Sequence, residues 1–199
     1  MAKWIFEPGH TDAEFKVRHM MVSWVRGHFK NVHGEVEFDP VEPEKMAVKA
    51  EIDATGIWSG EPARDAHLRT PDFLDTETYP KITFSSTRAE PRGQNDLRLY
   101  GDLTLCGVTK EMALDVHYSG AWKTPYWEES DEDYVDHGPI NRIGFEAETT
   151  IDRFDFGVAW ADSVERGGVV VGPEVRIKLD VEALLESDLV RIETEKRAA

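Results

Sequence analysis

Hydrophobic and polar residues alternate with a period of two along most of this chain. In the first clear segment Phe15, Val17 and His19 share one face, and charged residues occupy the opposite face. This alternation is typical of a β-strand that buries one face and exposes the other. It predicts about eight strands, within residues 14–19, 35–38, 48–54, 81–85, 97–105, 111–118, 142–151 and 175–181.

Turn-forming residues separate these segments. They include Asp39-Pro40, Glu42-Pro43, Pro91-Arg92-Gly93, Cys106-Gly107, Gly138-Pro139 and Gly167-Gly168. Strands with one apolar and one charged face are typical of antiparallel sheets, and no long helical period suggests a β-α-β fold. We therefore predict an all-β fold, either a sandwich or a closed barrel. Closure would leave no exposed sheet edge.

One segment, "RDAHLRTPDFLDTETYPKITFSST", joins a helix signal to a strand signal. Pro62 suits the first turn of a helix and Pro71 forces a stop, which predicts a short helix over roughly residues 61–69. The helix would carry three basic side chains, Arg64, His67 and Arg69. Two roles stay open for these side chains. They either pair with nearby aspartates, namely Asp65, Asp72 and Asp75, or form a cationic rim for an anionic head group.

The length of 199 residues fits one ordinary domain, which we predict over residues 1–185. Residues 186–199 lose the alternation, so we expect a short helix or a frayed end there. The acidic stretch from Pro125 to Gly138 is interpreted as a solvated hairpin loop, because its acids lack the glycine and terminal glutamate of a calcium-binding loop.

The net charge of −16, from 39 acidic and 23 basic residues, repels phosphate backbones and anionic lipid surfaces. Nucleic acid is therefore not an expected partner, although a local basic patch at a ligand mouth stays compatible with this net charge. No apolar run approaches the ~20 residues of a membrane-spanning helix, so we expect no stable membrane insertion. The opening residues lack the apolar core of a signal peptide, and Cys106 is the single cysteine. We expect a cytoplasmic chain without internal disulfides.

The faces predicted to point inward are almost wholly aliphatic and aromatic. A closed eight-stranded barrel can enclose one small ligand, and such faces would form an apolar cavity. The predicted lining residues are Phe15, Val17, His19, Phe38, Val48, Ile52, Phe84, Leu97, Leu99, Leu103, Leu105, Met112, Leu114, Val116, Phe145, Ile151, Val175 and Ile177. For His19 three roles stay open: a core or rim side chain, a ligand contact, or a metal ligand.

Catalytic motifs are weak. The spacing of His10, His19, His28 and His33 matches no familiar metal-ligand set, so we predict no metal site. No G-x-S-x-G nucleophile motif or glycine-rich phosphate loop occurs. We therefore expect neither an enzyme nor a cofactor. One alternative is an enzyme that acts on a hydrophobic substrate with His19 or His67 as general acid or base. Another is an interaction barrel without a ligand.

Four successive blocks carry a resemblance to a known family. They are "HTDAEFKVRHMMVSWVRGHF", "RDAHLRTPDFLDTETYPKITFSST", "GDLTLCGVTKEMALDV" and "RIGFEAETTIDRFDFGV" followed by "VVVGPEVRIKLDVEA". Over about residues 4–183 the chain resembles the YceI-like, polyisoprenoid-binding family.

The resemblance implies an extended, lipocalin-like eight-stranded antiparallel barrel. Such a barrel would hold an isoprenoid lipid, such as a polyprenyl phosphate or a quinone tail, with Phe73 as a further lining residue. It also implies a homodimer. The acidic stretch from Glu128 to Asp136 departs from the family pattern, and many relatives are exported.

Overall fold

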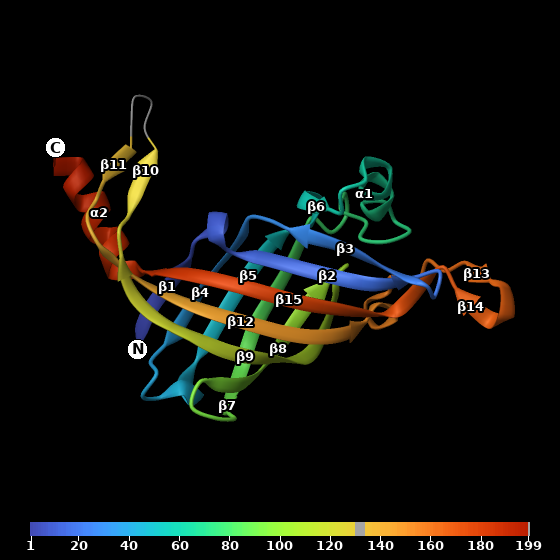
Figure 1. Ribbon diagram of the computed structural model, residues 1–199, viewed down its shortest axis with the longest axis horizontal. Helices are drawn as coiled ribbons and strands as arrows, with labels where there is room; N and C mark the ends of the chain where they lie inside the picture. The colour runs from blue at the N-terminus through green and yellow to red at the C-terminus, as the bar shows by residue number, and fades with distance from the viewer. Residues whose placement is uncertain (130–133, 199) are drawn as a thin grey trace.

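The computed structural model describes residues 1–129 and 134–198 and is mostly β-sheet (Figure 1). The strands are β1 (Ala2–Phe6), β2 (Asp12–His19), β3 (Ser23–Phe29), β4 (Val32–Phe38), β5 (Ala47–Asp53), β6 (Ile57–Trp58), β7 (Lys81–Pro91), β8 (Asp96–Leu105), β9 (Val108–Thr124), β10 (Trp127–Glu129), β11 (Tyr134–Asp136), β12 (Ile140–Asp152), β13 (Ser163–Val164), β14 (Gly168–Val169) and β15 (Val171–Leu185). The α-helices are α1 (Pro62–Leu68) and α2 (Glu186–Ala198). Short 3-10 helices are η1 (Pro8–His10), η2 (Pro43–Lys45), η3 (Ala54–Gly56), η4 (Arg153–Phe156) and η5 (Glu165–Gly167).

Eight strands close an antiparallel barrel in the order β1-β4-β5-β7-β8-β9-β12-β15, and β15 pairs with β1 to complete the ring. The predicted closed barrel is therefore confirmed. Each predicted strand segment is present, the first of them as β2, and α1 forms where the short helix is predicted. The sequence prediction missed β1 and β3, and it also missed the short strands β6, β10, β11, β13 and β14.

The strand β15 is paired along both edges. One edge pairs with β12, while the other pairs first with β2 and then with β1. β1 and β2 thus behave as one interrupted strand, with Phe6 opposite Ala183 and Asp12 opposite Asp180. The residues between Phe6 and Asp12 bulge outward as η1, where Pro8 lacks the N–H that a strand ladder needs.

β2, β3 and β6 continue the sheet from β15 beside the ring (Figure 1). β3 carries Gly27 in the middle of its inward face, directly opposite Phe15 on β2. A Cβ atom at Gly27 would lie 2.4 Å from Cζ of Phe15, so the aromatic ring occupies the space that a side chain would take. This glycine interrupts the apolar alternation, which explains why β3 was missed.

One end of the barrel interior is packed solid. Phe38 is 2% exposed, and its ring centroid lies 5.0 Å from that of Tyr118 and 5.1 Å from that of Phe145. Partial burial of Tyr118 raises the pKa of its hydroxyl. The three rings fill the interior where a ligand would otherwise fit.

The C-terminal segment forms a helix rather than a frayed end. In α2, Ile192 packs with Ile140 and Leu184 into a small separate cluster. The Asp188 carboxylate accepts hydrogen bonds from the backbone N–H and the side-chain amide of Asn141, at 2.8 and 2.9 Å. Across the described part of the chain, neither helix combines the length and the apolar character needed to cross a bilayer.

On either side of the centre of the acidic stretch, β10 pairs antiparallel with β11 to form a two-stranded ribbon. Residues 130–133 of this stretch lie outside the described residues. The side chain of Lys196 on α2 pairs with Glu128 and holds the pKa of that carboxyl below its usual range. The ribbon is therefore fastened to the C-terminal helix.

Replacing Phe38 with alanine should lower the free energy of unfolding by about 3–5 kcal/mol, because a fully packed ring leaves a cavity behind. Phe15→Ala should lower the free energy of unfolding by a smaller amount, because the Phe15 ring borders open space inside the barrel. Val41→Ala, at an exposed position, serves as the control. Urea unfolding measures all three, and equal losses for Phe15 and Phe38 would show a uniformly packed interior.

Candidate functional site

The other end of the barrel is hollow. It holds a cavity of about 370 Å³ with an almost wholly apolar wall. Ligand pockets in proteins usually span ~300–1,000 Å³, so this volume suits a small apolar molecule or part of a longer one. The cavity lies on the side of the barrel where α1, η4 and the start of β15 meet.

Most of the predicted lining residues border this cavity. They are Phe15, Val17, His19, Val48, Ile52, Phe73, Phe84, Leu103, Leu105, Met112, Leu114, Ile151, Val175 and Ile177. The remaining predicted residues lie instead in the packed end of the interior, namely Phe38, Leu97, Leu99, Val116 and Phe145. Both groups point inward, but the alternation reports only the face of a strand. It does not report how far along the barrel axis a side chain lies.

The predicted basic rim divides into two parts. Arg64 and His67 line the cavity, whereas Arg69 does not. The Arg69 guanidinium donates from Nε to the carbonyl of Thr55 at 2.7 Å and from Nη2 to that of Ile57 at 2.8 Å. Arg69 therefore holds the end of α1 against the backbone of residues 55–57.

Ser59 links Arg64 to Asp65. Arg64 donates from Nε to the Ser59 hydroxyl at 2.7 Å and from Nη2 to the Ser59 carbonyl at 2.8 Å. Asp65 accepts from the backbone N–H of Ser59 at 2.9 Å and also from its hydroxyl. A guanidinium has five N–H donors, so Arg64 keeps donors for a ligand at the cavity wall.

His67 faces the cavity with two aromatic rings. Its Nε2 atom lies 2.7 Å from a carboxylate oxygen of Asp72. Its ring meets Phe73 edge-on at 5.0 Å and Trp160 edge-on at 5.6 Å between centroids. Phe73 and Trp160 also contact each other, at 5.4 Å. Sequence analysis missed Trp160, because it lies in a loop where no alternation marks a buried face.

Arg153 is a second lining residue that the sequence prediction missed. It is only 4% exposed, and burial lowers the pKa of its guanidinium. Its side chain donates to the carbonyls of Val158 at 2.6 Å, Gly172 at 2.9 Å and Val171 at 3.0 Å. Arg153 thus satisfies three carbonyls and ties η4 to the start of β15 at the cavity wall.

His19 also lines the cavity, half-buried on the inward face of β2. Within the described chain its imidazole has no hydrogen-bond partner. Nothing therefore fixes its tautomer or ring orientation, which general acid–base catalysis would need.

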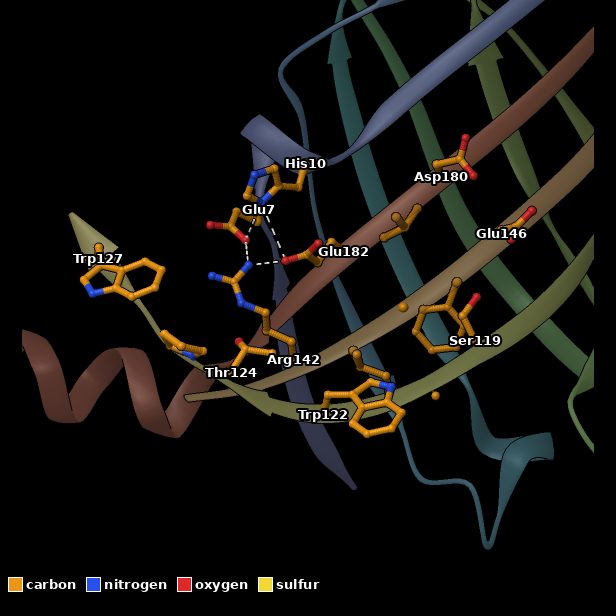
Figure 2. A pocket seen from close by; sticks show the side chains of 16 residues that line it. Glu7, His10, Ser119, Trp122, Thr124, Trp127, Arg142, Glu146, Asp180 and Glu182 are labelled. Atoms are coloured by element: carbon orange, nitrogen blue, oxygen red, sulfur yellow. Dashed lines mark hydrogen bonds and ion pairs between the residues drawn. The ribbon is translucent and has the colours of Figure 1, made fainter. Parts of the chain in front are cut away.

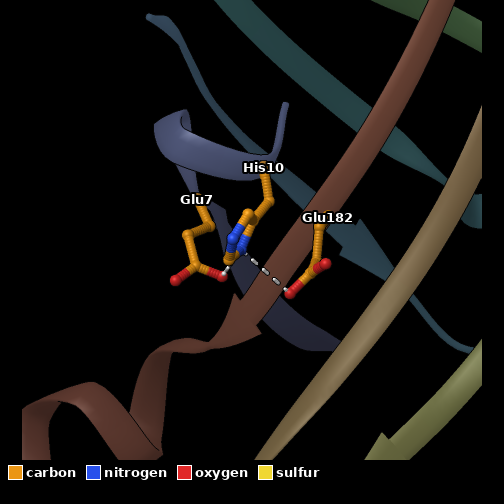
Figure 3. Close-up of side chains that lie close together, drawn as sticks. All are labelled: Glu7, His10 and Glu182. Carbon is orange, nitrogen blue, oxygen red and sulfur yellow. Dashed lines mark hydrogen bonds and ion pairs between the residues drawn. The ribbon is translucent and has the colours of Figure 1, made fainter. Parts of the chain in front are cut away.

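A second site lies on the outside of the barrel, where η1 interrupts the first strand (Figure 2). The Arg142 guanidinium points between Glu7 and Glu182 and forms an ion pair with each. The His10 ring lies between the same two carboxylates, with Nδ1 3.1 Å from Glu7 and 3.6 Å from Glu182 (Figure 3). Trp122 flanks this groove.

Glu7, His10 and Glu182 offer three potential metal-ligand atoms within 4.8 Å of one another. A cation at this point would compete with Arg142, which already forms an ion pair with Glu7 and with Glu182. The arrangement therefore fits a structural cluster of ion pairs better than a metal site, because it links the interrupted strand to β12 and β15. Sequence analysis could not find it, because its members lie far apart along the chain.

Cys106 lies in the two-residue turn between β8 and β9, with φ values of 50° for Cys106 and 72° for Gly107. Two left-handed residues are typical of the tight hairpin turns that match strand twist. The Sγ atom of Cys106 lies 3.5 Å from the carbonyl oxygen of Leu74, and burial raises the pKa of the Cys106 thiol to about 11. The thiol is thus protonated at neutral pH and is unsuited to act as a nucleophile.

Comparisons with known proteins agree with this architecture. The family model of the YceI-like domain matches residues 4–183. A UPF0312 protein of Shewanella oneidensis is 36% identical over 152 residues, which cover 76% of this chain and 73% of the relative.

Two solved structures share the fold. BcnA of Burkholderia cenocepacia has a TM-score of 0.70 at 22% identity, covering 89% of this chain and 98% of BcnA. A polyisoprenoid binding domain from Saccharophagus degradans has a TM-score of 0.66 at 12% identity, covering 93% of this chain and 99% of that domain.

Arg142→Met should lower the free energy of unfolding by roughly 2–4 kcal/mol, because it leaves two partly buried carboxylates without their partner. Adding Glu7→Gln and Glu182→Gln should restore part of that loss. Arg98→Met, which breaks an exposed pair with Asp115, should cost no more than about 1 kcal/mol. Chemical denaturation measures the free energy of unfolding of each variant. Similar losses of stability for the Arg142 and Arg98 variants would show that Arg142 does not link the strands.

Proposed function

Because this chain belongs to the YceI-like family, we propose that it is a non-enzymatic binding or carrier protein for an isoprenoid-type lipid. The apolar cavity inside the barrel is the observation that carries this proposal. A polyprenyl phosphate and a quinone with an isoprenoid tail are the two ligand types we propose. The fold shared with a polyisoprenoid binding domain supports the choice of ligand class.

Burial of apolar surface supplies the attraction. Each methylene removed from water contributes ~0.8 kcal/mol, so a chain held in the cavity gains several kcal/mol relative to water. A lipid tail is already dry inside a membrane, and shape and head-group contacts must then decide between membrane and protein. The cavity volume of about 370 Å³ is near the lower end for ligand pockets, so a long chain would extend through an opening.

We propose that Arg64 and His67 contact the head group. Both line the cavity, and both lie on α1. Arg69 is left out of this role because it does not line the cavity. An anionic phosphate would gain charge-assisted hydrogen bonds from Arg64, whereas an uncharged quinone head would gain less.

Catalysis is the alternative, and one observation bears on it. The pair of His67 and Asp72 resembles the base and orienting group of a catalytic set. However, among the described residues that line the cavity there is no serine or cysteine that could act as the nucleophile. The proposal therefore includes no reaction and no resident cofactor.

A ligand-free interaction barrel is the remaining alternative, and the hollow interior favours a carrier over it. A cytoplasmic location and a homodimer stay part of the proposal. The single cysteine supports the first, because a chain without disulfides needs no oxidising compartment. Cell fractionation and light scattering test these two points.

Met112→Trp should reduce binding of a prenyl quinone at least tenfold, because the larger side chain would occupy cavity space. Lys110→Trp on the same strand provides the matched control, since Lys110 is exposed and does not line the cavity. Native mass spectrometry with organic extraction measures the bound lipid, and circular dichroism confirms folding. Equal loading of both variants, or bare wild-type protein after incubation with prenyl lipids, would reject the carrier proposal.

The double variant Arg64→Gln, His67→Gln should weaken binding of a polyprenyl phosphate about tenfold or more and leave quinone binding nearly unchanged. The expected difference arises because only the phosphate presents a charge to these side chains. Competition between the two lipids for one protein sample measures it. An equal loss for both lipids would mean that the side chains support the fold of α1 rather than bind a head group.

A further inference from the structure

Four cations gather on the outer side of β2, β3 and β15, and we refer to them as the basic face: Lys16, Arg18, Arg26 and Arg176. Lys16 lies directly opposite Arg26 on one side and Arg176 on the other. Like charges at directly opposed positions destabilise a sheet. The fold therefore maintains this concentration of positive charge at a cost in stability.

Acidic side chains lie near the basic face, since Glu14 and Glu148 both lie opposite Lys178, two residues from Arg176. Across the described residues, none of its four cations forms an ion pair, although Glu14 and Glu174 lie on the same strands. Three of the cations lie instead near one aromatic ring, that of Trp24. The ring centroid lies 4.5 Å from Cζ of Arg18, 4.9 Å from Cζ of Arg176 and 5.9 Å from Nζ of Lys16. In a chain of net charge −16, this is a local reversal of sign.

The turn between β2 and β3 adds an exposed apolar tip, formed by Met20, Met21 and Val22. These side chains are 42%, 53% and 81% exposed, respectively. Met20 and Met21 have φ values of 51° and 62°, and the His19 carbonyl accepts a hydrogen bond from the Val22 N–H at 3.1 Å. A turn of this kind favours asparagine and glycine, so the left-handed backbone conformation does not explain why methionine occupies these two positions.

The apolar tip lies at one end of the ligand cavity. The Met20 N–H donates to the carbonyl of Val170 at 2.8 Å, and both Val170 and His19 line the cavity. In Figure 1 the turn between β2 and β3 lies beside β13 and β14, at the end of the molecule away from α2. The basic face, the apolar tip and the cavity end therefore occupy one region.

We propose that the basic face and the apolar tip together dock this protein on the surface of an anionic lipid bilayer. The cations would attract acidic lipid head groups, while the methionines and Val22 enter the interfacial layer. Trp24 suits the same boundary, since tryptophan is favoured where a membrane meets water. A bilayer accounts for the charge and the apolar tip together, whereas a nucleic acid would use only the charge.

Docking in this orientation would bring the cavity end to the bilayer, where lipid ligands reside. That use of the surface rests on the proposed carrier function. The docking itself does not, because it involves only the outer side of three strands and one turn.

Sedimentation of the full, delipidated chain with vesicles tests the proposal. Vesicles of equal parts phosphatidylglycerol and phosphatidylcholine should bind the protein, and pure phosphatidylcholine vesicles should bind it far less. Each cation removed should weaken the partition coefficient about fivefold, so Arg18→Gln with Arg26→Gln should weaken it about 25-fold. Lys110→Gln with Lys123→Gln makes the same change in net charge elsewhere and should have little effect.

The tip is tested by Met20→Asn with Met21→Gly, which suits the left-handed turn and should leave stability unchanged or raised. Vesicle binding should nevertheless fall severalfold, because the apolar contact is lost. An unchanged partition coefficient would show that the apolar tip is not part of the docking surface.

Several results would overturn the proposal. They are no binding of the wild-type chain to anionic vesicles, equal losses in the two charge-matched double variants, or a preference for duplex DNA over vesicles. A dimer that only the Arg18, Arg26 variant abolishes would assign the basic face to a second copy of the chain. Met112→Trp separates the two proposals, because it should abolish ligand binding and leave vesicle binding intact.

Discussion

Pairing of β15 along both of its edges closes the sheet, and the cavity exists because of that closure. β12 holds one edge, and β1 and β2 share the other. A closed ring leaves no strand edge within it unpaired, and all its apolar faces must point into one interior. The shared edge has a cost, because the first strand must break at η1. Arg142, together with Glu7 and Glu182, binds the break to the neighbouring strands.

The interior that results is divided along its length. Phe38, Tyr118 and Phe145 fill one end with aromatic rings, whereas aliphatic and aromatic side chains together line the other end and leave space between them. A protein interior usually packs as densely as an organic crystal, so a persistent apolar space is costly unless something occupies it. The packed end therefore provides stability, and the hollow end provides the capacity to bind. This division supports a carrier more than an inert structural barrel.

Charge is distributed as unevenly as packing. The chain is strongly acidic overall, so at long range it repels anionic surfaces. At contact range, screening by salt leaves only nearby charges effective, and the basic face then decides what approaches that side. Arg64 shows the same principle on a smaller scale, because its remaining donors face the cavity of an acidic protein. The net charge of the chain therefore predicts which partners are repelled only for surfaces on which acidic and basic side chains are evenly distributed.

The pattern of the sequence by itself determined the antiparallel all-β fold, eight of the strands, the short helix and the apolar character of the interior, while the choice of a closed barrel over a sandwich came from the family resemblance. Alternation of side chains is a local property of strands, and it survives without tertiary information. Only the tertiary structure decided which inward residues border the cavity, as the separation of Leu99 from Leu105 on β8 shows. It alone brought Glu7 to Arg142, placed Trp160 against His67, and gathered Arg26 with Arg176. These contacts depend on strand register and barrel closure, which join residues that no local pattern relates.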